Sequence, residues 1–408
     1  MEREIKHTEI GDIPADWEVF KLGDHSNIYR GGSPRPIQDY ITTADNGVNW
    51  IKIGDVKAGD KYITSTEEKI IPKGVSMSRE VKVGDFILSN SMSFGRPYIL
   101  KINGCIHDGW LVIQNYQSKY DAEYLYYLLS SEFVFAQYKK LAAGSGVQNL
   151  NKDIVTEVML PHPEKKEQKA IATILSDIDK VIYALEKEIN KKEKIRIGIQ
   201  QEYLSGKKRL SKYKKSVWEK KKLSELGYLD KNSINPQDFS QELFWEYSMS
   251  AYDNGQSPHK TWGYTMNSMR FTISAPVLLF NKLNVRQRRV WSITECKNNS
   301  VCSTEFLPFV SNKVDLQFLR ELLLMDKITY DFENISTGTS NSQKRISPDS
   351  FLEYEVFIPA DQIEQRTIVS TLNDANEEIE KLRKIKDKYS HIKKGMMNEL
   401  LTGKIRLV

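Results

Sequence analysis

Cysteine is scarce in this sequence, and the few cysteines are not spaced as metal ligands. The 408 residues include only Cys105, Cys296 and Cys302, and no Cys-x-x-Cys pair occurs. A zinc ribbon or a thiol redox pair requires such a pair. We therefore expect small, buried and reduced thiols, as in a reducing compartment.

Long apolar runs are also missing. No stretch approaches the ~20 uninterrupted apolar residues of a membrane-spanning helix. The first residues, "MEREIKHTEIGDIPADW", are charged throughout and lack the apolar core of a secretory signal. The sequence predicts a cytoplasmic protein.

Motifs of catalysis are absent from the sequence. We find no P-loop, no HExxH, no glycine-rich nucleoside fingerprint and no Asn/Asp-Pro-Pro-aromatic tetrapeptide of an amino-methyltransferase. The string "PDSFLEYEV" (348–356) is similar to a nuclease motif, but Glu355 stands where that motif needs lysine. The stretches "RGGSPRP" (30–36) and "AAGSGVQNL" (142–150) are interpreted as loops. We expect no catalytic residues and no metal site, and so a chain that is not an enzyme.

Positive charge is concentrated in two segments. The whole chain has a net charge of +5, but residues 162–215 contain 15 Lys and Arg against 8 Asp and Glu, and residues 362–408 contain 10 against 7. The rest of the chain is therefore mildly acidic. Charge alone does not predict a nucleic-acid partner.

The sequence contains an internal repeat with an offset of 197 residues. The stretch "QEYLSGKKRL" (201–210) returns as "NELLTGKIRL" (398–407). Upstream, with a one-residue difference in spacing, "VMLP" (158–161) matches "VFIP" (356–359), and each is followed by a Glu-Gln pair. The starts of the two halves, "DWEVFKLGD" (16–24) and "VWEKKKLSEL" (217–226), are also similar. The repeat predicts a tandem of variable domain, helix, variable domain and helix.

Each repeated segment contains apolar residues at alternating spacings of three and four, which predicts a heptad seam on a helix of about 40 residues, ~60 Å long. The predicted seam is Ile171, Leu175, Ile178, Ile182, Leu185, Ile368, Leu372, Ile379, Leu382 and Tyr389. A single long helix with one apolar stripe needs a partner, and the simplest partner is the other helix. The alternative is that each helix packs on its own domain. The heptads leave parallel and antiparallel pairing open.

The remaining segments have the size of ordinary domains. We predict one domain at residues 1–161, a helix and linker at 162–215, a second domain at 216–361, and a helix with a C-terminal tail at 362–408. Both domains combine short β-like runs with a later helix, which favours an α+β fold.

Base recognition requires forked donors on exposed loops, arginine for guanine and Asn or Gln for adenine. The predicted DNA-binding residues are Arg30, Arg35, Arg96, Gln148 and Asn149 in the first domain, and Lys282, Arg286, Arg288, Arg289, Gln343, Lys344 and Arg345 in the second. The run "NKLNVRQRR" (281–289) contains no acidic residue.

These segments together resemble the DNA specificity subunit of type I restriction-modification systems. The resemblance lies in "IGDIPADWEVFKLGD", "GGSPRP…GVNWIKIGDV", "VMLPHPEKKEQKAIATILSDID" and "HIKKGMMNELLTGKIRL". It implies two pseudo-symmetric target-recognition domains, each reading one half of a bipartite DNA site. It also implies that the two helices form an antiparallel coiled coil that sets the spacing.

The same resemblance implies partners and cofactors. Two methyltransferase subunits would dock on the helices and bind S-adenosylmethionine, and two restriction subunits would use ATP and magnesium. The chain itself would bind double-stranded DNA and no cofactor. The alternative is a non-catalytic coiled-coil scaffold that does not bind DNA; a fused nuclease or methyltransferase is disfavoured by the missing motifs.

Overall fold

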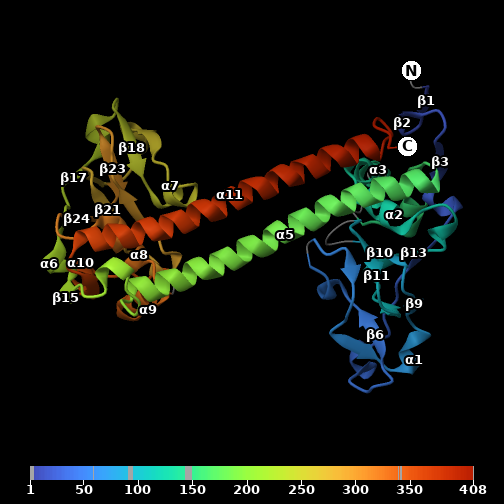
Figure 1. The fold of residues 1–408 in the computed structure, drawn as a ribbon, viewed down its shortest axis with the longest axis horizontal. Coiled ribbons are helices and arrows are strands. Elements are labelled where there is room, and N and C mark those ends of the chain that lie inside the picture. Colours follow the sequence, from blue (N-terminus) through green and yellow to red (C-terminus); the bar gives the residue numbers. More distant parts are fainter. Residues whose placement is uncertain are drawn as a thin grey trace. The chain divides into compact units, whose positions relative to one another are not determined.

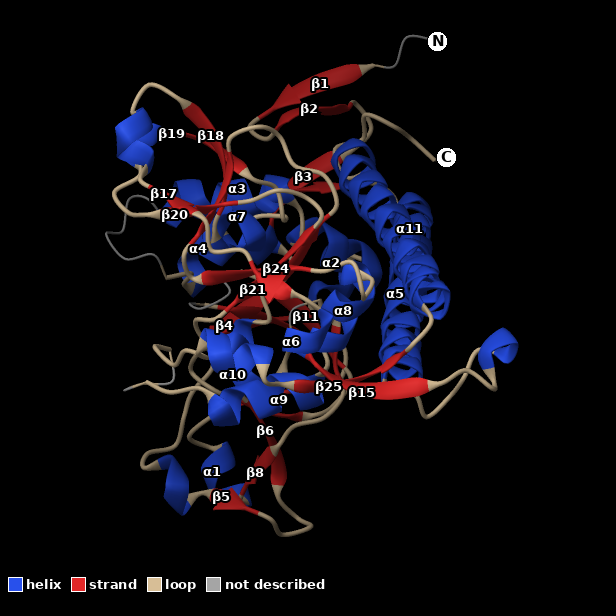
Figure 2. Ribbon diagram, turned by 90° about the vertical axis from the view of Figure 1, so that its left-hand side faces the viewer, coloured by secondary structure: helices blue, strands red, loops and turns tan. Residues whose placement is uncertain are grey.

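The structure is a computed structural model that describes residues 4–57, 59–90, 95–142, 149–338, 340 and 342–407. The chain forms two compact units, Met1–Glu186 with Lys384–Val408, and Lys187–Arg383. Each unit combines strands and helices (Figure 2) and includes part of both long helices, α5 (Lys165–Leu204) and α11 (Gln362–Leu400). The fold is therefore α+β with two long helices.

The first unit, whose strands are blue to teal in Figure 1, contains two five-stranded sheets. The first sheet has the order β4 (Asn27–Arg30), β13 (Trp110–Gln114), β10 (Phe86–Ser89), β11 (Pro97–Leu100) and β7 (Tyr62–Ile63). The second has the order β5 (Ile41–Thr42), β8 (Glu68–Ile70), β6 (Val48–Ile51), β12 (Gly104–Ile106) and β9 (Arg79–Val81). Side chains of β10, β13 and β11 are buried on both faces, so the first sheet lies within the core.

Short elements complete the first unit. Two antiparallel pairs are β1 (Ile5–Thr8) with β2 (Gly11–Pro14), and β3 (Glu18–Lys21) with β14 (Met159–His162). The helices are α1 (Pro72–Val75), α2 (Ala122–Leu129), α3 (Glu132–Ala142) and α4 (Lys152–Thr156). Helix α2 begins where the Asp121 carboxylate accepts the backbone N–H groups of Glu123 and Tyr124, as an N-cap residue does.

The second unit has a similar composition of elements. A four-stranded sheet has the order β16 (Tyr228–Leu229), β24 (Phe306–Val310), β21 (Val277–Asn281) and β22 (Val290–Ile293). A five-stranded sheet has the order β17 (Ser233–Ile234), β20 (Arg270–Thr272), β23 (Ser300–Ser303), β18 (Leu243–Tyr247) and β19 (His259–Trp262). Strand β15 (Trp218–Lys222) pairs with β25 (Glu355–Pro359), as β3 does with β14. The helices are α6 (Leu223–Leu226), α7 (Met249–Asp253), α8 (Leu316–Leu323), α9 (Asp326–Ile335) and α10 (Pro348–Leu352).

The two long helices lie side by side and run antiparallel within each unit (Figure 1). In the first unit Lys393 pairs with Asp179 at 2.6 Å and Lys386 with Glu186 at 3.7 Å. In the second unit Lys192 pairs with Glu378 at 2.7 Å. Residue numbers fall along one helix as they rise along the other, so the two-helix pairing is antiparallel.

The apolar stripe of the long helices packs in two ways. Ile171 and Leu175 belong to the core of the first unit, and Ile368 and Leu372 to the core of the second. Further along, Ile379 is buried, and the remaining predicted seam positions are half-buried: Ile178, Ile182, Leu185, Leu382 and Tyr389. Helix pairing and packing on a domain therefore both occur along one stripe.

The compact units differ from the four segments expected from the sequence. The predicted boundaries at 161/162, 215/216 and 361/362 separate domains from helices, whereas the compact units divide α5 after Glu186 and α11 after Arg383. The four-segment division stays a prediction. Among the described residues no helix has the length and apolar character needed to cross a membrane, and no group of three His, Cys, Asp or Glu side chains is placed to hold a metal ion.

Candidate nucleic-acid interface

In the first unit, two predicted arginines meet at the turn 107–109 between β12 and β13. Arg35 donates from Nη2 to Oδ2 of Asp108 at 3.2 Å, and Arg30 donates from Nε to the Asp108 carbonyl oxygen at 3.2 Å. Ser33 donates from Oγ to Oδ1 of the same carboxylate at 3.1 Å. Asp108 thus holds two exposed forked donors on one turn.

His107 completes this cluster. Its Nδ1 accepts the backbone N–H of Gly109 at 2.9 Å, and its Nε2 lies 3.0 Å from Oδ1 of Asp108. Partial burial opposes ionisation of Asp108, but the neighbouring His107 ring and the hydrogen bonds from Ser33 and Arg35 outweigh it and lower the pKa of that carboxyl. The carboxylate therefore stays charged and keeps the donors oriented.

The two glycines of "RGGSPRP" explain why this segment reaches the turn. Gly31 donates its N–H to the Trp110 carbonyl at 2.8 Å, and Gly32 donates to Ile106 at 3.1 Å. A Cβ at Gly31 would lie 2.1 Å from the His107 carbonyl oxygen. Only glycine permits this approach of one backbone to another.

Asn149 lies near the same turn, whereas Arg96 lies in other surroundings. Leu150, the next residue after Asn149, donates its N–H to the Asn90 carbonyl at 2.9 Å, and Asn90 Nδ2 donates to the Asp108 carbonyl at 3.0 Å. Arg96 instead lines a pocket with Asp60 and Tyr126, among others. Gln148 lies outside the described residues.

In the second unit, two segments distant in sequence lie side by side. Asn284 donates its N–H to the Lys344 carbonyl at 2.8 Å, and Ile346 donates to the Lys282 carbonyl at 3.1 Å. An antiparallel bridge joins Leu283 to Arg345. The predicted stretches 282–289 and 343–345 therefore form one surface.

Each of the four arginines on this surface pairs with an acid from elsewhere in the chain. Arg288 Nη2 lies 2.6 Å from Asp326 Oδ1, and Arg345 Nε lies 3.1 Å from Glu305 Oε2. Arg289 donates from Nε and Nη2 to the Asp253 carboxylate at 2.8 and 2.7 Å. Arg286 pairs with Glu333. Hydrogen bonds from Arg289 and Arg286 lower the pKa of Asp253 and Glu333 respectively. Sequence reasoning missed these acids because none lies within the basic run.

The four arginines of this surface differ in how much of their side chains is exposed. Arg289 is mostly buried, whereas Arg286, Arg288 and Arg345 keep nearly half of their side-chain surface exposed. Gln343 also lies on this surface and accepts a hydrogen bond from Arg345 through its backbone carbonyl. The exposed three are therefore the better placed to reach a ligand.

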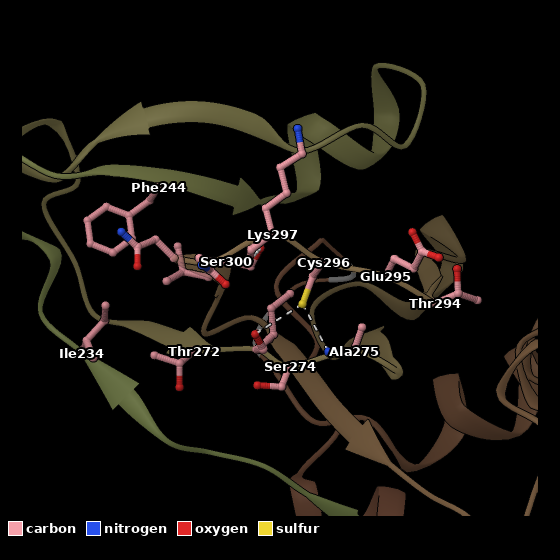
Figure 3. Close-up of a pocket in the computed structure, with 14 residues that line it drawn as sticks. Ile234, Phe244, Thr272, Ser274, Ala275, Thr294, Glu295, Cys296, Lys297 and Ser300 are labelled. Carbon is pink, nitrogen blue, oxygen red and sulfur yellow. Dashed lines mark hydrogen bonds between the residues drawn. The ribbon is translucent and has the colours of Figure 1, made fainter.

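A separate pocket of about 900 Å³ lies in the second unit (Figure 3). Cys296 accepts the backbone N–H of Ala275 through Sγ at 3.2 Å, and the Lys297 ammonium lies 3.9 Å from the centre of the Trp245 ring. No predicted DNA-binding residue belongs to the described lining of this pocket. The pocket and the arginine surface are distinct features.

The repeated segments meet at a joint in each unit. In the first unit, Trp17 donates from Nε1 to the buried Glu167 at 3.0 Å, and Arg406 donates to the same carboxylate at 2.5 and 2.7 Å. In the second unit, Trp218 donates from Nε1 to the buried Glu364 at 3.1 Å, and Arg209 Nη1 lies 3.7 Å from the same carboxylate. Each copy of the Gly-Lys-x-Arg-Leu ending therefore packs on the domain of the other half.

The glutamines of the repeated Glu-Gln pairs attach a domain helix to each long helix. Gln168 Oε1 accepts the N–H of Asp121, the N-cap of α2, at 2.7 Å. Gln365 Oε1 accepts the N–H of Asp315, the N-cap of α8, at 2.7 Å. The equivalent glutamines of the two repeats therefore make equivalent contacts.

Comparison with known protein families agrees with this duplicated plan. A family model described as the type I restriction modification DNA specificity domain matches residues 14–194. The MjaVIII specificity subunit of a type I restriction enzyme from Methanocaldococcus jannaschii is 23% identical over 428 residues, covering 97% of this chain and 94% of the relative. Residues 14–194 therefore match that DNA specificity domain, and nearly the whole chain is similar to specificity subunits of type I restriction enzymes. A second specificity subunit of that organism, MjaIX, is 28% identical over 260 residues, covering 60% of this chain and 59% of its own.

Solved structures of the type I restriction-modification system have the same fold. A chain from a structural study of complex assembly and conformational transition in that system superposes with a TM-score of 0.64 at 13% identity, covering 96% of this chain and 99% of that one. A type I system S subunit from M. genitalium gives a TM-score of 0.54 at 15% identity, covering 98% and 99%. The architecture expected from the resemblance to specificity subunits is confirmed.

Proposed function

We propose that this specificity subunit binds DNA sequence-specifically, with each unit reading one half of a bipartite target. The observation that carries this proposal is the duplicated joint, in which the same tryptophan, glutamate and arginine types connect a variable domain to both long helices. Such internal duplication matches the relation between two half-sites on a duplex. The long helices set the distance between the half-sites.

Base recognition is assigned to the two arginine surfaces. Arg30, Arg35 and Asn149 present forked donors near the turn 107–109, and the 282–289 and 343–345 segments present them in the second unit. Such donors pair with guanine or adenine edges in the major groove. The acids that pair with these donors hold them in position. The acids also offset the positive charge of the donors, so little net charge remains to attract phosphate.

The partners follow from this role. Two methyltransferase subunits that bind S-adenosylmethionine dock on the long helices, and two restriction subunits that use ATP and magnesium complete a cytoplasmic assembly. The subunit itself performs no catalysis and binds no cofactor. Because its domains are mildly acidic, the methyltransferase subunits neutralise much of the phosphate charge.

Methylome sequencing tests this function. DNA from cells that express the chain with its methyltransferase subunit is compared with DNA from cells that express the methyltransferase alone. We expect N6-methyladenine at one split motif only when the chain is present, and exchange of residues 1–161 for those of another specificity subunit to change one half-motif. Unchanged methylation with partner binding intact would contradict DNA recognition.

A further inference from the structure

The stretch 282–289, assigned above to base recognition, has an unfavourable backbone conformation at two positions. Asn284 and Arg288 each have a φ of 50°, in the left-handed region that non-glycine residues occupy only when the surrounding structure holds them there. The Arg288 carbonyl accepts a hydrogen bond from the Tyr252 hydroxyl at 3.3 Å, and strand β22 begins two residues later at Val290. The stretch therefore depends on contacts with its neighbours to keep its conformation.

Arg320 of helix α8 makes one of these contacts at the end of the stretch. Its Nε donates to the Val290 carbonyl at 3.2 Å, and its Nη1 donates to Oε1 of Glu321 at 2.5 Å. Because the guanidinium group is planar and rigid, the bond to Glu321 also fixes the direction of Nε. Only 26% of the Arg320 side chain is exposed. Arg320 therefore supports the first residue of β22 rather than reaching a ligand.

Glu321 extends this contact to the two long helices. Its Oε2 accepts a hydrogen bond from Nη2 of Arg196 on α5 at 2.7 Å, and its backbone carbonyl accepts one from Nε2 of Gln200 at 3.2 Å. Arg196 also donates from Nε to Oδ1 of Asn376 on α11 at 3.1 Å. Hydrogen bonds therefore connect α11 and α5, through α8, with the end of the stretch 282–289. All these residues belong to the second unit.

The first unit connects its long helices to its domain at equivalent positions. At the offset of 197 residues, Lys393 and Asp179 correspond to Arg196 and Asn376. Lys393 and Asp179 pair at 2.6 Å, and Asp179 accepts a hydrogen bond from the Tyr127 hydroxyl of α2 at 2.7 Å. The position of this polar contact is thus the same in both units, although the side chains differ.

The next step, from the domain helix to the strand, uses different chemistry in the two units. Tyr126 precedes Tyr127 as Arg320 precedes Glu321. Tyr126 lines a pocket with Pro97, the first residue of β11. A tyrosine has no guanidinium group, so the bridge made by Arg320 is a property of the second unit.

We propose that Arg320 is a positioning residue for base recognition, which holds the end of the stretch 282–289 where it reads the second half-site. This inference rests on the proposed function and adds a residue that acts without touching DNA. Glu321 and Arg196 hold Arg320 in turn. Recognition by the second unit therefore depends on the contact with the long helices as well as on the exposed arginines.

DNA binding by the full chain together with its methyltransferase subunit tests this role. The duplexes carry the split motif found by methylome sequencing, either intact or with one base pair changed in one half. Discrimination is the ratio of the two Kd values. We expect Arg320→Met, which keeps the aliphatic stem and removes the donors, to lower second-half discrimination about tenfold, as the loss of one base contact does. First-half discrimination stays unchanged, and Arg320→Lys, which retains a charged donor, loses less.

The matched control is Val356→Ala, because Val356 is 2% exposed and belongs to the core of the second unit. This change lowers the thermal unfolding temperature by removing buried methyl groups, and it leaves discrimination in both halves unchanged. A double-mutant cycle adds a second measurement. Arg320→Met combined with Arg286→Ala reduces second-half discrimination by less than the product of the two single effects, because both changes act on one stretch.

Unchanged second-half discrimination in Arg320→Met would overturn the positioning role. So would an equal loss in both halves, a similar loss in Val356→Ala, or independent effects of Arg320→Met and Arg286→Ala. Failure of the proposed function is distinguishable from these outcomes, because the wild-type chain would then direct methylation to no split motif.

Discussion

The two joints between domain and long helices use the same residue types with different geometry. In the first unit Arg406 makes hydrogen bonds to Glu167 and two more to Asp16, at 2.8 and 2.9 Å. In the second unit Arg209 lies 3.7 Å from Glu364 and stacks over the Trp218 ring at 4.2 Å. The residue before Trp218 is Val217, so the second joint has no counterpart of Asp16.

The pKa shifts of the joint residues agree with this difference in geometry. The hydrogen bond from Arg406 lowers the pKa of Asp16, and the bonds to Glu167 and Asp16 raise the pKa of Arg406. Burial raises the pKa of Glu364, and the Ser216 hydrogen bond and the Arg209 charge only partly offset it. The first joint is therefore a satisfied ion network, and the second holds a buried carboxyl with a weaker cation partner.

Further along the helices, it is the second unit that has the ion pair with the more buried acid. Tyr127 of α2 donates to Asp179 at 2.7 Å, which also pairs with Lys393. The equivalent contact in the second unit joins Glu321 of α8 to Arg196 at 2.7 Å. Asp179 is 32% exposed, but Glu321 is only 4% exposed. Among these contacts, the short ion pair with a buried carboxylate lies at the joint in the first unit and along the helix in the second.

Replacing the joint arginines gives the largest expected difference. Arg406→Ala leaves Glu167 buried without its cation, which costs about 3–5 kcal/mol when a buried pair is broken. Arg209→Ala removes a longer contact and a cation–π stack, which costs about 1 kcal/mol. Amide hydrogen exchange measures the opening free energy of each unit. Equal losses in the two variants would contradict the difference between the joints.

Replacing the cations along the helices should reverse that order. Arg196→Met deprives the buried Glu321 of one cation while Arg320 remains in contact, so we expect a loss of about 3 kcal/mol in the second unit. Lys393→Met breaks a partly exposed pair, worth about 1 kcal/mol or less. Hydrogen exchange of α8 and α2 reports the two effects. A larger loss for Lys393→Met would refute the assignment by burial.

The raised pKa of Glu364 gives the second unit a distinct pH dependence. A carboxyl with a folded pKa above its ordinary 4.5 stabilises the fold fully below pH 4.5, and this contribution is lost as the pH rises through the folded value. Asp16, with a lowered pKa, contributes above pH 3.8 and loses its contribution in more acidic solution.

Calorimetry between pH 4.5 and 7 on wild type and Glu364→Gln measures this effect. We expect the second unit to gain stability toward pH 4.5 in wild type, and that gain to be smaller in the variant. Glu167→Gln serves as the control, because it weakens the first unit across the range. An unchanged pH profile in Glu364→Gln would exclude the carboxyl as its source.

The exposed arginines should have the smallest effect on stability. Arg35→Ala and Arg286→Ala remove surface ion pairs worth about 0–1 kcal/mol. Each change instead relaxes one half-motif, because a bidentate base contact is worth about 1–3 kcal/mol of discrimination. Methylome sequencing distinguishes the half affected by each variant. Relaxation of the same half by both variants would contradict separate reading by the two units.

Much of the joint could be predicted from the sequence, but its pairing could not. The repeat identified Trp17 with Trp218 and the Glu-Gln pairs. It did not show that Arg406 reaches Trp17 and Glu167, because those contacts join segments far apart in the chain. The acids that pair with the second-unit arginines were missed for the same reason. Gly31 and Gly32 were interpreted as part of an ordinary loop, since the close approach of Gly31 depends on the turn at His107, 76 residues away.

The sequence by itself determined the tandem plan and the long helices, because local patterns repeat wherever the same residues recur. Tertiary structure decided the antiparallel pairing and the domain on which each ending packs. It also decided the acid that each arginine finds. These depend on contacts between segments far apart in the chain, and a heptad pattern or a basic run contains no information about which distant residue will lie beside it.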